Sequence, residues 1–292
     1  MTKKKTYTSA LSFRTALETR LLQISQNERL DINKLRKQFT FDRFLARLFS
    51  AKQSIPWALK GGHALQLRLS RARATRDVDL VLKELRILSE NSSEREAALL
   101  ALLSEQTSQE LGDYFEYQIS GPIMELENAP LGGSRFLIEA RMDGRTFDRF
   151  HIDIAFGDLW IEPLDSVAPR AWLDFAGIDT QPFPVIPKEQ HFAEKLHAYT
   201  RPMPEGVINS RSKDLVDMLL LIGTGELDAS RLASIINATF KRRGTHTVSK
   251  DLDPPPDSWL VTYTSLAKEC GITLDMPASY QALKDFVKKL PL

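Results

Sequence analysis

The sequence predicts an α+β fold in which a mixed sheet core with flanking helices is followed by a helical C-terminal domain. Three observations support this order: apolar residues recur at helical spacing over residues 9–50, residues 114–156 contain stretches typical of strands, and helical spacing returns beyond residue 187. The expected domains are N-terminal helices over residues 1–55, an α/β core over 56–185 and the helical domain over 186–292.

The elements of the N-terminal half follow from the spacing of apolar residues and glycines. Two helices are expected over residues 9–50, and a short strand over 56–59 is closed by Gly61-Gly62 and followed by a brief helix over 64–69. Residues 75–82 alternate polar and apolar side chains, which predicts a strand. A charged, Ala/Leu-rich helix is expected over 94–111, with Ser93 as its N-cap.

The second half divides at a proline-rich segment over residues 182–187. Before it, strands are predicted over 114–119, 135–141 and 150–156, and Asp143-Gly144 predicts a hairpin turn between the last two. The prolines mark the boundary of the C-terminal domain. Beyond them, helices are expected over residues 189–200, 212–221, 229–242, 258–270 and 279–290.

Composition and charge exclude several classes of protein. The 292 residues are 42% hydrophobic and 26% charged, and no run approaches the ~18 apolar residues that a membrane span needs. The single Cys270 rules out a disulfide framework, so we expect a cytoplasmic protein without a membrane partner.

The formal net charge is +1, but residues 1–80 carry 17 Lys/Arg against 6 Asp/Glu, and the remainder carries 22 against 32. A basic N-terminal quarter is expected of a protein with a polyanionic partner, and equally of one with solvated helix faces.

Two glycines and two aspartates form the first candidate site. A glycine pair at a strand-to-helix turn lets backbone N–H groups approach a phosphate, and the helix N-terminus favours negative charge; Gly61 and Gly62 fit this role. Asp77 and Asp79 lie two apart in a predicted strand, so both project to one face. Such carboxylates repel each other unless a cation neutralises them, and all-oxygen ligation suits Mg²⁺. Either motif alone is more often structural, but together they predict a site for metal and triphosphate.

A third carboxylate is expected from a neighbouring strand, because two metals bridged by two side chains leave coordination positions open. Asp153 lies between Ile152 and Ile154, which is a costly place for a charge without a partner. We therefore predict that Asp153 is the third metal ligand. The alternative interpretation is the polar face of an amphipathic strand.

The two glycines, the Asp-x-Asp pair and the later Asp resemble the nucleotidyltransferase fold of the polymerase-β-like superfamily and, within it, the AbiEii-type toxins, which include the MenT toxins. The resemblance spans residues 60–221, and residues 186–187 (Ile-Pro), 194–198 (Glu-Lys-Leu-His-Ala) and 211–217 (Arg-Ser-Lys-Asp-Leu-Val-Asp) are similar to the family's later motifs. It implies that Lys195 is the catalytic lysine, that Asp217 is an acidic residue important for toxicity, and that Asp214 belongs to the same motif. It further implies that Thr75 lies where related toxins carry a hydroxyl that an antitoxin kinase phosphorylates.

The resulting hypothesis is a metal-dependent nucleotidyltransferase toxin of a toxin–antitoxin system. It transfers NMP from an NTP to RNA, with the tRNA 3′ end implied by the resemblance, and releases pyrophosphate. The expected cofactor is Mg²⁺ and the expected partners are an NTP, RNA and a cognate antitoxin. The predicted site comprises catalytic Asp77, Asp79, Asp153, Lys195 and Asp217, metal ligands Asp77, Asp79 and Asp153, and nucleotide-binding Lys60, Gly61, Gly62, His63, Lys195 and Asp214. The basic residues Arg68, Arg71, Arg73 and Arg76 suit an RNA backbone.

Two alternative functions stay open. The same fold can transfer NMP to a protein or small-molecule hydroxyl. The second is a non-catalytic nucleic-acid-binding protein, although three carboxylates without a metal would repel RNA at the place where it should bind. Without the resemblance, Lys195, Asp214 and Asp217 would be interpreted as ordinary surface ion pairs.

Overall fold

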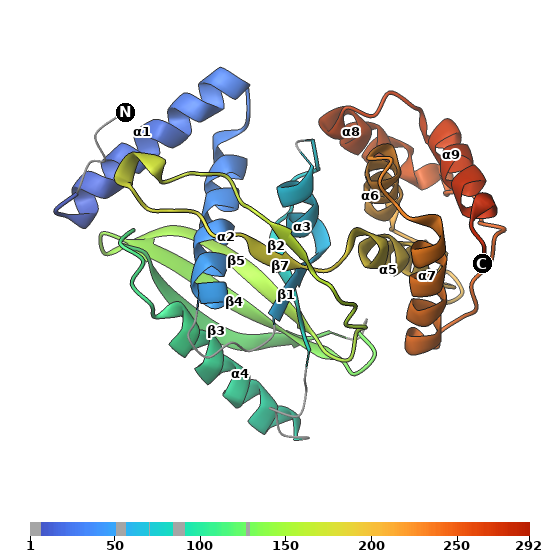
Figure 1. Ribbon diagram of the computed structural model, residues 1–292, viewed down its shortest axis with the longest axis horizontal. Coiled ribbons are helices and arrows are strands. Elements are labelled where there is room, and N and C mark those ends of the chain that lie inside the picture. The colour runs from blue at the N-terminus through green and yellow to red at the C-terminus, as the bar shows by residue number, and fades with distance from the viewer. Residues whose placement is uncertain (1–6, 51–56, 70, 84–90, 127–128) are drawn as a thin grey trace. The chain divides into compact units, whose positions relative to one another are not determined.

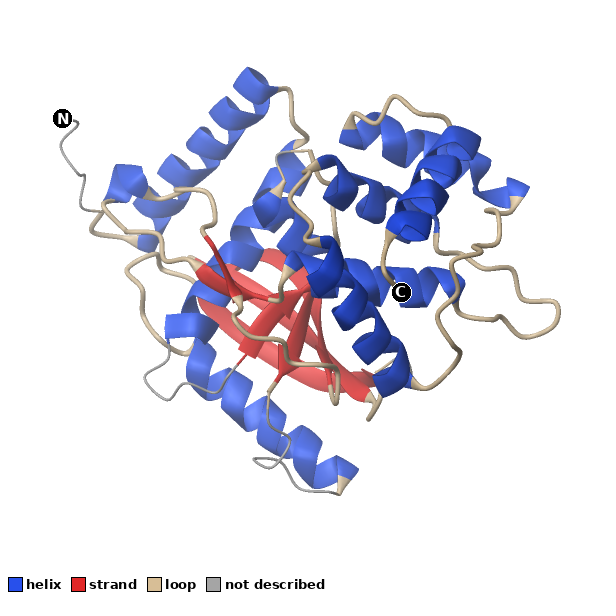
Figure 2. Cartoon of the chain, turned by 45° about the vertical axis from the view of Figure 1, so that its right-hand side comes forward, coloured by secondary structure: helices blue, strands red, loops and turns tan. Residues whose placement is uncertain are grey.

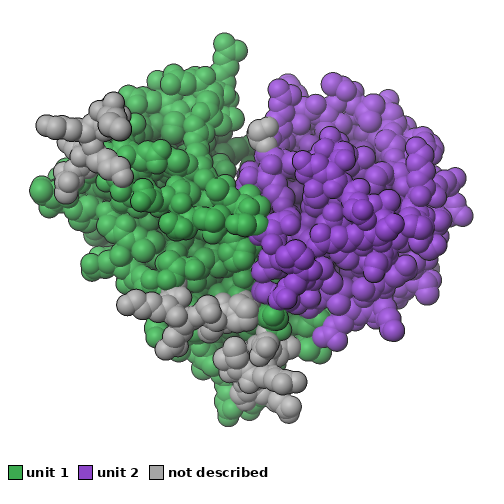
Figure 3. Space-filling model, in the orientation of Figure 1, with its two compact units in different colours: residues 1–63, 74–157, 166–185 green, residues 64–73, 158–165, 186–292 purple. Residues whose placement is uncertain are grey.

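The computed structural model describes residues 7–50, 57–69, 71–83, 91–126 and 129–292. The chain forms two compact units, shown in Figure 3: unit 1 comprises residues 1–63, 74–157 and 166–185, and unit 2 comprises residues 64–73, 158–165 and 186–292. The described residues confirm the predicted α+β class. Within them, no helix combines the length and the apolar character that crossing a membrane requires.

The predicted helices and strands are present, with ends shifted by a few residues (Figure 1). The helices are α1 (Ala10–Glu28), α2 (Ile32–Ser50), α3 (Gly61–Arg68), α4 (Ser92–Thr107), α5 (Lys188–Thr200), α6 (Ser212–Gly223), α7 (Ala229–Arg243), α8 (Leu260–Cys270) and α9 (Met276–Lys289). The strands are β1 (Trp57–Lys60), β2 (Asp77–Leu82), β3 (Glu116–Glu125), β4 (Gly133–Met142), β5 (Arg145–Ala155), β6 (Asp165–Val167) and β7 (Phe183–Val185).

Two local features differ from the expectation. Strands β6 and β7 were not predicted, because each has only three residues and β7 lies among the prolines that suggested a boundary. The N-cap of α4 is Asn91 and not Ser93. The Asn91 side chain accepts hydrogen bonds from the backbone N–H groups of Ser93 and Glu94, at 3.0 and 3.4 Å, which satisfies two N–H groups of the first turn.

The strands form one mixed sheet in the order β3-β4-β5-β2-β1-β7-β6, drawn in red in Figure 2. Strand β2 pairs antiparallel with β1 and parallel with β5, and this register aligns Asp79 with Lys60 on one side and with Asp153 on the other. Strand β4 pairs antiparallel with β5, and the register aligns Arg135 with Asp153. Paired residues of adjacent strands point to the same face, so four separate segments meet on one face of the sheet.

The opposite face of the sheet is the core of unit 1. Val78, Leu80, Ile152 and Ile154 are fully buried there, which explains the alternation of β2 and β5. Helices α1, α2 and α4 pack against this face; for example, the rings of α2 contact Phe150 of β5. The helices thereby leave the other face, with its charged side chains, half-exposed.

Unit 2 is helical and has a core of its own. Helices α5 to α7 contribute Phe192, Leu215 and Ile236, and the last two helices contribute Tyr263 and Leu283, all of them buried. The predicted helical character of the C-terminal part is therefore confirmed.

Buried ion pairs explain part of the uneven charge of the sequence. In unit 1, Arg43 and Arg47 of α2 both bind Asp113, whose side chain is fully buried. In unit 2, Arg68 and Arg73 are almost completely buried, and each binds an acidic residue from later in the chain. Basic side chains of the N-terminal quarter thus neutralise carboxylates that follow far along the sequence.

The prediction that Arg68 and Arg73 face an RNA backbone is therefore wrong. Their guanidinium groups are occupied by Asp165, at 2.6 Å, and by Asp217, at 2.8 Å. Charge counts along a sequence do not distinguish such internal pairs from a basic surface. Arg71 and Arg76 are the members of that segment whose side chains are exposed.

Candidate active site

Three carboxylates lie on the half-exposed face of the sheet in unit 1. Asp77 and Asp79 are two apart on β2, and Asp153 is the register partner of Asp79 on β5. The side chains of Asp77 and Asp153 are 33% and 16% exposed to solvent, so ions can reach them. His151, two residues before Asp153, shares this face, and its Nδ1 lies 3.4 Å from Asp77 Oδ1. The sheet therefore brings together the three residues that the sequence proposed as metal ligands.

A guanidinium lies among these carboxylates. Arg135 of β4 donates from Nε to Asp153 Oδ1 and from Nη2 to Asp153 Oδ2, both at 2.6 Å, and its Nη2 is 3.9 Å from Asp77 Oδ2. These hydrogen bonds to Asp153, together with the charges of Asp153, Asp77 and Asp79, raise the pKa of Arg135, while burial acts in the opposite direction. The cation paired with Asp153 in this arrangement is thus a side chain of the protein.

The donor chemistry of this face fits a hard divalent cation. Carboxylate oxygens on neighbouring strands are ligands that Mg²⁺ accepts, and their backbones are already in register. Among the described residues, however, no three His, Cys, Asp or Glu side chains are grouped closely enough to hold a metal ion. Both oxygens of Asp153 are engaged by Arg135, which explains why the backbone placement suits a metal while the side chains are not assembled around one.

The turn from β1 to α3 brings its backbone against Asp79. Gly61 has φ +66°, in the left-handed region, and a Cβ built on it would lie 1.9 Å from Asp79 Oδ2. No side chain fits there, so glycine is required both by conformation and by the close approach of the carboxylate. Gly62 and the half-buried Lys60 flank this position, at the start of α3 and the end of β1.

We expect Gly61→Ala to lower both the stability of unit 1 and any activity that depends on Asp79. Gly144 in the β4–β5 turn is a matched control, because its φ is +68° and a Cβ there meets nothing within 4 Å. Gly144→Ala should cost about 1–2 kcal/mol, the strain of the left-handed backbone alone. Gly61→Ala should cost clearly more in urea-induced unfolding. Equal losses for the two variants would show that the contact with Asp79 does not matter.

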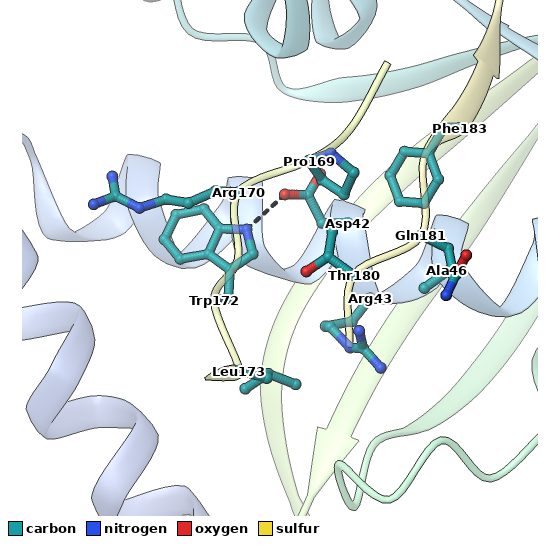
Figure 4. Close-up of a pocket in the computed structure, with 10 residues that line it drawn as sticks. All are labelled: Asp42, Arg43, Ala46, Pro169, Arg170, Trp172, Leu173, Thr180, Gln181 and Phe183. Atoms are coloured by element: carbon teal, nitrogen blue, oxygen red, sulfur yellow. Dashed lines mark hydrogen bonds between the residues drawn. The ribbon is translucent and has the colours of Figure 1, made fainter. Parts of the chain in front are cut away.

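His63 is the buried anchor of this turn. Its Nε2 lies 2.9 Å from Asp42 Oδ1, and Asp42 Oδ2 accepts a 2.6 Å hydrogen bond from Trp172 Nε1. Figure 4 shows the indole of Trp172 directed at Asp42 beside a small cavity that Arg43 and Phe183 also line. The side chain of His63 is 0% exposed, so it fixes the start of α3 to α2 and has no surface for a nucleotide.

The later motifs form a buried ionic cluster in unit 2. Lys195 Nζ of α5 lies 3.0 Å from Asp214 Oδ1 and 2.6 Å from Asp217 Oδ2, both on α6. Asp217 is fully buried and also accepts two hydrogen bonds from Arg73, at 3.0 and 2.8 Å. Arg211 Nη1 is 3.7 Å from Asp214 Oδ2. These residues are therefore not surface ion pairs, and the partner of Asp217 besides Lys195 is Arg73.

The cluster stabilises the charged forms of its members. Burial disfavours the charge of Lys195, but Asp217 and Asp214 outweigh it and hold its pKa above the usual value. Burial likewise opposes ionisation of Asp217, yet Lys195 and Arg73 keep its pKa below the usual value. Lys195 and Asp217 are consequently both charged at neutral pH, and each depends on its partners.

Two residues of the carboxylate face, Arg135 and His151, were not identified from the sequence. His151 could be found from strand periodicity, because it lies two residues before Asp153. Arg135 has no local signal, since only the β4–β5 register aligns it with Asp153. The hydroxyl of Thr75, the proposed regulatory position, donates to the Asp77 backbone carbonyl at 3.4 Å.

The sheet, the glycine turn against Asp79 and the carboxylates on two adjacent strands define the class of protein as a nucleotidyltransferase, and comparison with known proteins supports this class. The family model "Nucleotidyl transferase AbiEii toxin, Type IV TA system" matches residues 43–285, so the chain belongs to the AbiEii family of nucleotidyltransferase toxins. Membership implies an NTP substrate and a cognate antitoxin.

Two solved structures are similar to this chain at low sequence identity, and that of MenT4 shows the same fold. The nucleotidyltransferase toxin MenT4 from Mycobacterium tuberculosis H37Rv is 15% identical with a TM-score of 0.54, over 95% of this chain and 98% of that chain. JHP933 from Helicobacter pylori is 14% identical with a TM-score of 0.49, over 89% and 92%. A comparison with curated proteins finds no significant match.

Proposed function

We propose that the protein transfers NMP from an NTP to an RNA acceptor, the tRNA 3′ end, with release of pyrophosphate, and that it does so as the toxin of a toxin–antitoxin pair. One observation carries this proposal: Asp79, beside the glycine turn, is in register with Asp153 on the adjacent strand. A glycine turn at the start of a helix, next to a row of carboxylates, is a combination that suits phosphoryl transfer.

Each residue of this face has a proposed part in the reaction. Asp77, Asp79 and Asp153 would hold Mg²⁺, which when bound supplies Lewis-acid polarisation of phosphoryl oxygens. The backbone of Gly61 and Gly62 binds the phosphates of the NTP. Asp153 accepts the proton of the acceptor hydroxyl, whose oxygen bonds to the α-phosphorus. The bond between that phosphorus and the oxygen bridging to the β-phosphate breaks, and pyrophosphate leaves.

For Lys195, Asp214 and Asp217 we propose a contribution to nucleotide binding that depends on their mutual ion pairs. The family resemblance of this motif supports the proposal, and the raised pKa of Lys195 keeps this side chain positive within its ion pairs.

The test is incubation of the purified protein with Mg²⁺, total tRNA and each α-³²P-labelled NTP in turn. We expect label in an RNase-sensitive band with at least one NTP, and loss of that label in EDTA. Label in a protease-sensitive band of a cell lysate would instead support transfer to a protein hydroxyl. Absence of label in RNA, protein and small molecules would contradict the proposal.

A further inference from the structure

The carboxylate face holds its own cation in the form of Arg135. The guanidinium binds both oxygens of Asp153, and it contacts a second predicted ligand, Asp77, at 3.9 Å. A carboxylate paired with Arg through two parallel hydrogen bonds has its preferred lone pairs occupied. A divalent cation and this guanidinium therefore require the same oxygens.

Arg135 is also placed where a cation can displace it. Its side chain is 25% exposed, and the pair is open to solvent on the same face as Asp77 and His151. A fully buried pair would resist exchange, because each charge would be left without a partner or water, whereas water can solvate the charges of this partly exposed pair when it opens. The other arginines of this face differ, because Arg141 and Arg149 of the β4–β5 hairpin bind Glu139 instead.

We propose that Arg135 is an internal competitor for the cation site: it holds Asp153 when no metal is bound, and a divalent cation must displace it before Asp153 becomes a ligand. The inference rests on the proposed function, because it takes Asp77, Asp79 and Asp153 as the metal ligands. Arg135 is thus a positioning residue that acts through Asp153. It offsets the charge of Asp153 in the resting protein and weakens metal binding.

The first test is a Mn²⁺ titration followed by the EPR signal of the free ion, without nucleotide. Arg135→Met should bind Mn²⁺ about tenfold more tightly than the unmodified protein, since it removes the competing charge from Asp153. Arg135→Lys keeps the charge but loses the two parallel hydrogen bonds. Its Mn²⁺ affinity should lie between those of Arg135→Met and the unmodified protein. Arg141→Met is the matched control, because it removes one charge from the same strand and face, and it should leave the Mn²⁺ affinity unchanged.

The second test follows the unmodified protein by NMR while Mg²⁺ is added. The Nε–H resonance of Arg135, assigned in ¹⁵N-labelled protein by its absence in Arg135→Lys, should shift when Mg²⁺ is added. A resonance that stays in place while Mg²⁺ saturates the site, or Mn²⁺ affinity in Arg135→Met that equals or falls below that of the unmodified protein, would overturn the inference.

A further arm separates this inference from the proposed function. Asp79→Asn should weaken Mn²⁺ binding in the same titration, because Asp79 is a proposed ligand and does not accept the two hydrogen bonds from Arg135. Metal binding that depends on Asp79 but not on Arg135 would overturn the competitor role alone. If no Mn²⁺ binds, or if Asp79→Asn binds Mn²⁺ as tightly as the unmodified protein, the metal site and the competitor role are overturned together.

Discussion

Asp79→Asn should reduce nucleotidyl transfer by about 10²–10³-fold or more, the scale of losing one group that stabilises charge in the transition state. The amide nearly matches the carboxylate in size, so the close packing against Gly61 is kept while the anionic ligand is lost. The fold should persist, because Asp79 lies on the half-exposed face of β2 and not in the core. The measurement is label incorporation into tRNA at saturating NTP, with thermal unfolding recorded for both proteins.

Glu139→Gln is the matched control for this variant. Glu139 is a carboxylate on the same face of the sheet, but it pairs with Arg141 and Arg149 and is not aligned with the glycine turn. It should retain transfer activity. If Asp79→Asn and Glu139→Gln were equally active, Asp79 would have no part in the chemistry.

Asp217→Asn should lower the free energy of unfolding by about 3–5 kcal/mol, the usual cost of removing one partner from a buried charge network. The substitution leaves Lys195 and Arg73 buried with too little negative charge, and two hydrogen bonds from Arg73 lose a charged acceptor. Because the pKa of Asp217 is held below its usual value, this stabilisation is present at neutral pH and is lost as the pH falls below the pKa of an ordinary carboxyl.

The comparison variant is Glu226→Gln, which breaks the exposed pair between Glu226 and Lys188 in the same unit. Urea-induced unfolding should show no measurable change for it, since exposed pairs contribute little. A variant at Asp217 as stable as the unmodified protein would contradict the network. If the loss of stability is large, an inactive Asp217 variant shows first that unit 2 no longer folds, and it is not by itself evidence that Asp217 takes part in the reaction.

The helices and longer strands could be predicted because their signals are local. Alternation placed Asp77 and Asp79 on one face of β2, and the Asp-Gly pair located the turn between β4 and β5. Strands β6 and β7 escaped prediction, since three residues are too few to show a period and β7 pairs with the distant strand β1. Local patterns therefore predicted the elements but not the full sheet order.

In the candidate site, too, local signals could be read from the sequence and long-range partners could not. Asp153 could be proposed from its apolar neighbours, whereas Arg135 becomes its partner only through strand register. The basic N-terminal segment suggested an RNA surface, but Arg68 and Arg73 bind acids from distant positions instead. Net charge along a chain cannot reveal such pairs, because burial and partner choice are properties of the folded state.

We propose that the carboxylates of β2 and β5 hold the metal at which an NTP reacts. The most direct test is an anomalous difference map from crystals grown with Mn²⁺ and a non-hydrolysable NTP analogue. We expect an anomalous peak ligated by Asp77 and Asp79, with Asp153 released from Arg135 and the phosphates of the analogue beside Gly61. A peak elsewhere in the molecule, or an analogue bound away from this face, would contradict it.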